Sequence, residues 1–170
     1  MYTKVPYGYE PPPEQEKGTL IYYDSFEHTT YEELDLAAEH AISHAFTKLV
    51  LYLIHEQTMK RMSAEPVSAY YKREKRLEEW IQARSGSLAG IDTWEGKRKK
   101  YAPIDSALRH LTETLPAPHF ICVTPEMANF FASLSIFEDW ISRIRLLLLS
   151  EPRSIHPRLD QYRNRWSTIG

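Results

Sequence analysis

The chain has 170 residues, of which 42% are hydrophobic and 26% are charged, a composition typical of a soluble globular protein. The formal net charge of −2 argues against a generally basic coat that would bind nucleic acid over a whole surface. The charge is uneven, because residues 1–66 have an excess of acidic side chains whereas residues 67–115 have an excess of basic ones. Cys122 is the single cysteine, which excludes an intrachain disulfide and a cysteine-rich zinc site.

The sequence shows no secretory signal and no membrane-spanning segment. The residues at the N-terminus lack the apolar run of a signal peptide. The longest apolar runs, residues 49–54 and 146–149, are far shorter than a membrane span. We therefore expect a cytoplasmic, soluble intracellular protein with no membrane partner.

Residues 1–18 are predicted to form an extended arm. Four prolines favour an extended, polyproline-like backbone, and glutamate side chains keep this backbone hydrated. Tyr2, Tyr7 and Tyr9 are unusual for a plain linker, because tyrosine is a favoured contact residue in interfaces. Two interpretations remain open: the arm lies on its own domain, or it docks on a neighbouring subunit or another protein.

A short strand and a long helix are expected next. Thr19–Phe26 has the β-branched and aromatic content of a strand. Thr30 and Glu33 have the spacing of a capping box, which predicts a helix that begins there and runs to about Met62. The apolar face of this predicted helix contains Leu34, Ala38, Ala41, Ile42, Ala45, Leu49, Tyr52 and Leu53.

A second helix is expected over residues 67–84, followed by a loop over residues 85–101. Pro103 begins a third and shorter helix, which Pro116 ends. Residues 119–123 then predict a second short strand that could pair with the first one.

The stretch over residues 124–150 is predicted to be the central core helix. Thr124 can cap its start and Pro125 suits its first position. Seven apolar residues recur at steps of three and four, namely Met127, Phe130, Leu134, Phe137, Ile141, Ile144 and Leu148. The sequence therefore predicts a mainly α fold: a single-domain helical bundle over residues 19–170, with two long helices, shorter helices and a minor two-stranded β element.

Two groups of residues have the composition of a metal or an acid–base site. His40 and His44 stand four residues apart on the first predicted helix, the spacing at which two imidazoles share a metal ion. They lie opposite the apolar face, whereas metal sites of bundles project inward. Asp24, Glu27 and His28 stand where a strand gives way to a helix, but turn and helix-start preferences explain them as well. We therefore predict no metal, no cofactor and no catalytic residue, and keep His40 and His44 as candidate metal ligands.

The basic run in the middle of the chain is a candidate anion or nucleic-acid site. Lys97, Arg98, Lys99 and Lys100 are adjacent cations that would attract phosphate, and Tyr101 would stack on a base. No glycine-rich phosphate loop accompanies them.

Three functional hypotheses follow from these features. The first is a non-enzymatic interaction or assembly protein, whose arm contacts a protein partner or a second copy of the chain. The second is a nucleic-acid or anion-binding protein that uses Lys97–Lys100. The third is a metal-dependent helical enzyme that uses His40 and His44. The lack of a catalytic motif favours a protein that is not an enzyme.

Overall fold

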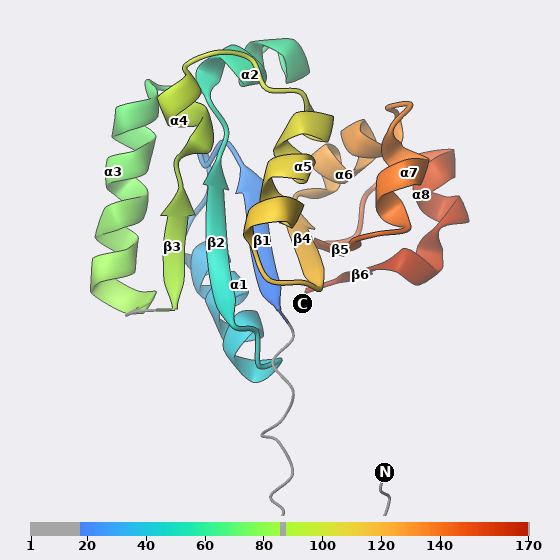
Figure 1. Ribbon diagram of the computed structural model, residues 1–170, viewed down its shortest axis with the longest axis horizontal. Coiled ribbons are helices and arrows are strands. Elements are labelled where there is room, and N and C mark those ends of the chain that lie inside the picture. Colours follow the sequence, from blue (N-terminus) through green and yellow to red (C-terminus); the bar gives the residue numbers. More distant parts are fainter. Residues whose placement is uncertain (1–17, 86–87, 170) are drawn as a thin grey trace, which may run out of the picture.

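The structure is a computed structural model that describes residues 18–85 and 88–169 (Figure 1). Within these residues six strands are found: β1 (Thr19–Asp24), β2 (Lys48–Leu53), β3 (Ala89–Asp92), β4 (His119–Val123), β5 (Arg145–Leu148) and β6 (Trp166–Thr168). They form one parallel sheet in the order β3-β2-β1-β4-β5-β6. From β1 the chain adds β2 and β3 on one side of the sheet. It then adds β4, β5 and β6 on the other side of β1, as in doubly wound α/β folds.

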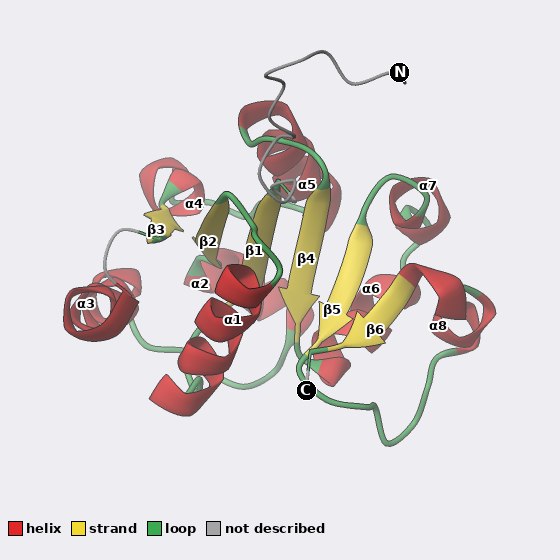
Figure 2. Cartoon of the chain, turned by 90° about the horizontal axis from the view of Figure 1, so that it is seen from below, coloured by secondary structure: helices red, strands yellow, loops and turns green. Residues whose placement is uncertain are grey.

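Helices connect the strands and cover both faces of the sheet. They are α1 (Tyr31–Ser43), α2 (Glu56–Met62), α3 (Tyr70–Trp80), α4 (Trp94–Arg98), α5 (Ile104–Thr114), α6 (Pro125–Ala132), α7 (Phe137–Ile141) and α8 (Pro157–Gln161). A π-helical turn, Ile81–Ser85, continues α3, and a 3-10 turn, Arg163–Arg165, precedes β6. Seen from below, α1 and α3 lie on one face, while α5 and α7 lie on the other (Figure 2).

The two faces of the sheet bury two separate hydrophobic clusters. Successive side chains of a strand point to opposite faces, so one strand contributes to both clusters. Leu20 and Tyr22 of β1 pack with α1 and α3, whereas Ile21 and Tyr23 pack with α5, α6 and α7. Strands buried on both faces have almost continuous apolar sequences, as parallel sheets generally do.

The predicted helical bundle is wrong, because the chain is an α/β fold built on a parallel sheet. The first predicted helix begins correctly with the capping box of Thr30 and Glu33, but it ends at Ser43. Ala45 then adopts a φ of 59°, in the left-handed region, and the chain continues into β2. The periodicity of a short apolar run does not distinguish a strand buried on both faces from a buried helix.

The predicted central helix over residues 124–150 is also wrong, since this stretch forms α6, α7 and β5. Its start is confirmed: the Thr124 hydroxyl accepts a hydrogen bond of 3.1 Å from the Met127 amide, and Pro125 occupies the first turn. Phe137 and Ile141 are fully buried, as expected. The spacing thus identified side chains that are buried, but it did not identify the secondary structure to which they belong.

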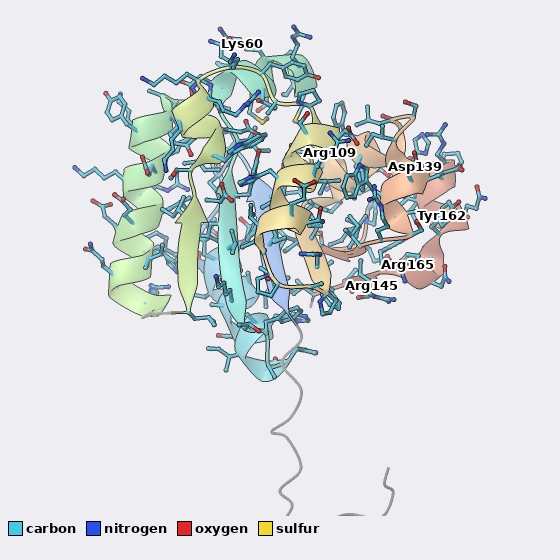
Figure 3. All side chains as sticks on the ribbon, in the orientation of Figure 1. Lys60, Arg109, Asp139, Arg145, Tyr162 and Arg165 are labelled. Carbon is cyan, nitrogen blue, oxygen red and sulfur yellow. The ribbon has the colours of Figure 1, made fainter. Side chains whose placement is uncertain are left out.

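Other predicted elements are mostly confirmed. The third helix corresponds to α5, and the two predicted strands are β1 and β4, which pair with each other. The prediction of a loop over residues 85–101 is wrong, because this stretch contains β3 and α4. In the described part of the chain, no helix has the length and apolar character needed to cross a membrane. Charged side chains such as Lys60, Arg109 and Asp139 are exposed on the outside (Figure 3).

Candidate functional site

The strand order places a crevice between the carboxyl ends of β1 and β4. The chain leaves β1 for α1 on one face of the sheet and leaves β4 for α6 on the other. Diverging connections of this kind create the usual ligand site of doubly wound sheets. A cleft of about 460 Å³ opens at this position, and we call it the first compartment. Its volume lies within the range of about 300–1,000 Å³ that is common for small-molecule sites.

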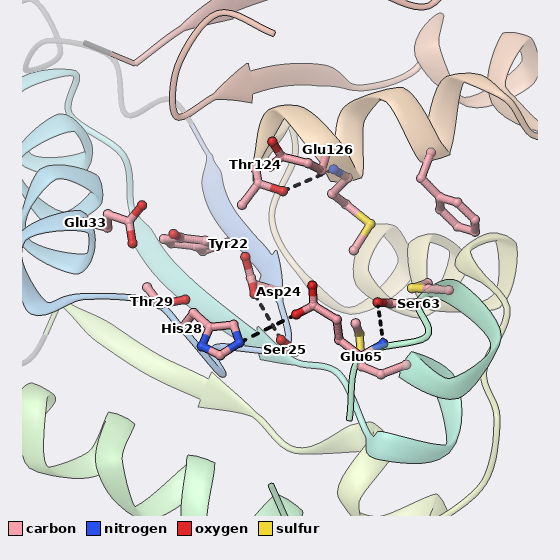
Figure 4. Close-up of a pocket in the computed structure, with 14 residues that line it drawn as sticks. Tyr22, Asp24, Ser25, His28, Thr29, Glu33, Ser63, Glu65, Thr124 and Glu126 are labelled. Carbon is pink, nitrogen blue, oxygen red and sulfur yellow. Dashed lines mark hydrogen bonds and ion pairs between the residues drawn. The ribbon is translucent and has the colours of Figure 1, made fainter. Parts of the chain in front are cut away.

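The first compartment is acidic. Asp24, Glu33, Glu65 and Glu126 line it from different elements (Figure 4). Among the described residues that line it, the one basic side chain is His28, whose Nε2 atom lies 3.8 Å from Oε1 of Glu65. Both partners of this pair are largely exposed, so the pair lies at the rim of the cleft.

Asp24 is a carboxyl group of this compartment whose pKa is raised. It is the last residue of β1, and its Oδ1 atom accepts a hydrogen bond of 2.8 Å from the Phe26 amide. Burial raises the pKa of Asp24 and the charge of Glu33 adds to this effect, although hydrogen bonds from Phe26 and Ser25 oppose it. A carboxyl group with a raised pKa that faces a cleft is a candidate functional residue.

Tyr22 forms part of the cleft floor and was missed by the sequence analysis. Its side chain is fully buried and lies between Glu33 and Asp24 (Figure 4). Its hydroxyl makes no hydrogen bond of ordinary geometry with any described residue, although Thr29 lies near it. Burial raises the pKa of Tyr22, so the hydroxyl keeps its proton. An unpaired buried hydroxyl is costly. The hydroxyls of Tyr23 and Tyr70 also lack such a partner among the described residues, but Tyr22 is the one of the three that lines this cleft.

Each helix that begins at the cleft has a side-chain cap. The N-termini of α1 and α6 lie here, and helix dipoles favour negative charge at such ends. In α1, however, the Thr30 hydroxyl accepts a hydrogen bond from the Glu33 amide, and the Glu33 carboxylate accepts one from the Thr30 amide. In α6, Thr124 caps the helix and Pro125 has no amide hydrogen. The chain's own side chains thus satisfy one amide in the first turn of each helix.

A buried arginine holds the loop that follows Asp24. Arg73 on α3 is 2% exposed and donates hydrogen bonds to the carbonyl oxygens of Ser25, Ile54 and Ser68. Glu27 accepts hydrogen bonds of 2.8 Å and 3.0 Å from the Ser68 amide and hydroxyl, which lower its pKa. Glu27 is therefore a structural residue, whereas Asp24, from the same candidate group, lines the cleft.

A second compartment of about 220 Å³ adjoins the first one. Met62 and Phe130 line both compartments, so the two compartments are neighbours. Arg61 lies over the ring of Tyr101, 4.4 Å from the ring centroid, at the edge of this second compartment. The apolar part of its lining also includes Pro103, Ile104, Leu134 and Ile136.

The predicted basic run leads into Tyr101, which lines this second compartment. Lys97 and Arg98 end α4, Lys99 has a φ of 58°, and all four cations of the run are exposed. Arg98 lies over the ring of Trp94, 4.7 Å from its centroid. Of the five candidate residues, Tyr101 is the one that lines a described cavity. The nucleic-acid interface stays a prediction.

The candidate metal ligands lie away from the cleft. The rings of His40 and His44 stack with centroids 3.9 Å apart, and Nδ1 of His44 lies 3.0 Å from the His40 carbonyl oxygen. His55 does not share their helix, because it caps α2 and accepts a hydrogen bond from the Gln57 amide. Among residues 18–85 and 88–169, no group of three or more potential metal ligands comes together.

The sequence pointed to part of this site. It singled out Asp24, His28 and Tyr101, but it could not bring them to one edge without the parallel sheet. Tyr2, Tyr7 and Tyr9 lie outside the described residues, so their predicted contacts with another chain stay a prediction. No protein-family model and no curated protein sequence matches this chain.

Proposed function

We propose that this protein binds an unphosphorylated nucleoside in the cleft at the carboxyl ends of β1 and β4. The observation that carries this proposal is the pair of adjoining compartments. Four carboxylates line the first one, whereas the second is lined mostly by flat and apolar side chains, together with Arg61, Asp105 and Ser135. A nucleoside has two matching parts, a sugar with several hydroxyl donors and a flat base.

The second compartment suits the base. Its volume of about 220 Å³ lies below the usual range for a complete ligand site, so it would hold one part of a larger ligand. Tyr101 and Phe130 provide aromatic rings, and stacking on an aromatic side chain contributes about 1–3 kcal/mol per base. Met62 adds a flexible apolar wall that adapts to ring shape.

The first compartment suits the sugar. Ionised carboxylates accept hydrogen bonds from hydroxyl groups, and such charge-assisted bonds are stronger than neutral ones. Asp24 and Glu33 lie deeper in the cleft, beside Tyr22, while Glu126 lies at its exposed rim. Doubly wound folds often bind nucleotides at this position, which supports the proposal by analogy of fold.

The charge of the cleft argues against a phosphorylated ligand. The connection from β1 to α1 contains no glycine, so it lacks the close backbone approach that phosphate-binding loops use. The carboxylates around the cleft would also repel a phosphate group. We therefore propose ligand binding rather than phosphoryl transfer.

Titration calorimetry of the full chain with adenosine and with uridine tests this function. We expect saturable binding, and Tyr101→Ala should weaken it at least about fivefold, the lower end of a stacking contribution. The control is Tyr71→Ala, because Tyr71 is 67% exposed on α3 and does not line the cleft. This control should bind as the wild type does.

A second pair of variants tests the location by steric block. Ser135 is exposed and lines the second compartment, so Ser135→Trp should obstruct it without disturbing the core. Ser142 is exposed at the end of α7 and lines neither compartment, so Ser142→Trp is the control. The proposal is wrong if neither nucleoside binds, or if each control loses as much affinity as its partner variant.

A further inference from the structure

We infer that the first compartment selects a positively charged group, so that the preferred ligand is a nucleoside with an ammonium group on its sugar. This inference rests on the proposed function and specifies its ligand class. The physical basis is the charge of the compartment together with the unpaired hydroxyl in its floor.

The carboxylates of the compartment have little neutralising charge within the cleft. In the described part of the chain four carboxylates line it, and His28, the one basic side chain found there, is directed at Glu65 on the rim. Arg73 and Arg76 lie behind the Asp24 loop, where backbone carbonyls accept hydrogen bonds from both guanidinium groups and Glu56 pairs with Arg73. Lys60 projects from α2 near the same edge of the sheet but does not line the cleft (Figure 3). A cation in the cleft would therefore meet uncompensated negative charge.

Tyr22 gives an independent reason to expect a ligand with several donors. Its buried hydroxyl has no hydrogen-bond partner of ordinary geometry among the described residues, although Thr29 lies near it, and the Tyr22 side chain lies beside Asp24 and Glu33 in the floor. A tyrosine hydroxyl can accept one hydrogen bond while it donates another. An ammonium group has three donors and no acceptor, so it can bond to a carboxylate and to this hydroxyl together.

The remaining lining favours an organic cation over a hard metal ion. Met59, Met62 and Phe130 surround the carboxylates with thioether and aromatic surfaces. A cation gains energy over an aromatic face, and the carbon atoms next to an ammonium pack against apolar side chains. Calcium and magnesium prefer a shell of oxygen ligands, which this lining does not provide on all sides.

A matched series of adenosine derivatives tests the inference at pH 7. The series is 5′-amino-5′-deoxyadenosine, its 3′-amino isomer, adenosine and adenosine 5′-monophosphate, which differ only in the group on the sugar. We expect one of the two amines to bind at least about tenfold more tightly than adenosine, which corresponds to about 1.4 kcal/mol. The monophosphate should bind at least about tenfold more weakly than adenosine.

Two variants assign the preference to the compartment. In Asp24→Asn and in Glu126→Gln, the ratio of the amine affinity to the adenosine affinity should fall toward one. Glu113→Gln is the control, because Glu113 is exposed on α5 and does not line the cleft, and it should keep the wild-type ratio. If adenosine binds but neither amine binds more tightly, or if both variants keep the ratio, this inference is wrong and the proposed function stands. If no member of the series binds, the proposed function is wrong.

Discussion

The Nη1 atom of Arg73 donates a hydrogen bond of 2.9 Å to the backbone carbonyl of Ser25, the residue that follows Asp24. The same nitrogen donates to the Ile54 carbonyl at 2.6 Å, so one buried cation joins the loops that follow β1 and β2. The floor of the cleft is thus positioned by a charge that does not line the cleft. Such indirect support keeps a site rigid without neutralising its carboxylates.

Replacement of this arginine should destabilise the fold. Arg73→Met removes the partner of three backbone carbonyls and the 3.1 Å ion pair between Arg73 and Glu56. Breaking a buried charge network of this kind costs about 3–5 kcal/mol of unfolding free energy. Urea denaturation measures the loss, and Lys75→Met, an exposed change on the same helix, should remain within about 0.5 kcal/mol of wild type. A loss of less than about 1 kcal/mol for Arg73→Met would show that the network is dispensable.

Asp24→Asn should stabilise the protein at neutral pH. Burial raises the pKa of Asp24 above its ordinary value of 3.8, which means that the ionised form is disfavoured in the folded state. The contribution of Asp24 to stability is therefore complete at acidic pH and is lost as the pH rises through the raised pKa. Asparagine does not titrate. The unfolding free energy of the variant should therefore increase relative to that of wild type as the pH rises from 4 to 7. Denaturation curves of both proteins across this pH range measure the difference. The raised pKa of Asp24 would be contradicted if wild type became more stable relative to the variant as the pH rises.

The same variant should lose nucleoside affinity while it gains stability. A residue that destabilises the fold but contacts the ligand is the expected pattern for a functional site. Calorimetry with adenosine therefore complements the denaturation curves. A variant that is more stable and also binds as tightly as wild type would show that Asp24 does not contact the ligand.

The sequence predicted individual elements better than their assembly. The capping box is observed, with hydrogen bonds of 3.0 Å and 3.1 Å between Thr30 and Glu33, because it depends on four consecutive residues alone. β2 and β5 were assigned to helices, because their apolar residues are buried on both sides and lack the alternation that marks a half-buried strand. Only tertiary packing against helices on both faces makes these runs strands.

The candidate site could be predicted only in part for a related reason. Asp24 and His28 were recognisable as residues at the end of a strand. Whether they form part of a site depends on whether other strands end at the same edge of the sheet. In a parallel sheet the carboxyl ends gather, which brings Thr124 and Glu126 after β4 into the same cleft. Nothing in the local sequence distinguishes the unpaired hydroxyl of Tyr22 from that of an ordinary core tyrosine.

A buried carboxylate supports the segment that leads to Tyr101, and its removal should be costly. Glu95 on α4 is fully buried and accepts hydrogen bonds from the His55 amide at 2.9 Å, from the Thr58 hydroxyl at 2.8 Å and from the Tyr52 hydroxyl. Glu95→Leu leaves three buried donors unpaired, each at about 1–3 kcal/mol, so the loss should exceed about 3 kcal/mol. Glu95→Gln keeps an acceptor of the same shape and should lose much less. Equal losses for the two variants, measured by urea denaturation, would contradict the hydrogen-bonding role.

Gly18 should be intolerant of any side chain. Its φ is 85°, a region that L-residues avoid, and an added Cβ would lie 2.3 Å from the Pro118 carbonyl oxygen. That oxygen cannot move freely, because it accepts a hydrogen bond of 3.1 Å from the Thr19 amide. The Gly18 carbonyl in turn accepts one of 2.8 Å from the Thr47 amide, so the residue is fixed between the segments that precede β4 and β2.

Gly18→Ala should therefore lower the unfolding free energy by about 1–3 kcal/mol from backbone strain, and by more if the contact with Pro118 is not relieved. Gly90→Ala is the matched control, because no atom lies within 4 Å of the Cβ that it would add. Gly90 is in the edge strand β3, and its φ is not in the left-handed region, so alanine there should leave stability within about 0.5 kcal/mol or raise it slightly. Urea denaturation of the two variants side by side separates a specific steric conflict from the general effect of replacing glycine. If Gly18→Ala were as stable as Gly90→Ala, the predicted steric conflict between a Cβ at position 18 and Pro118 would be contradicted.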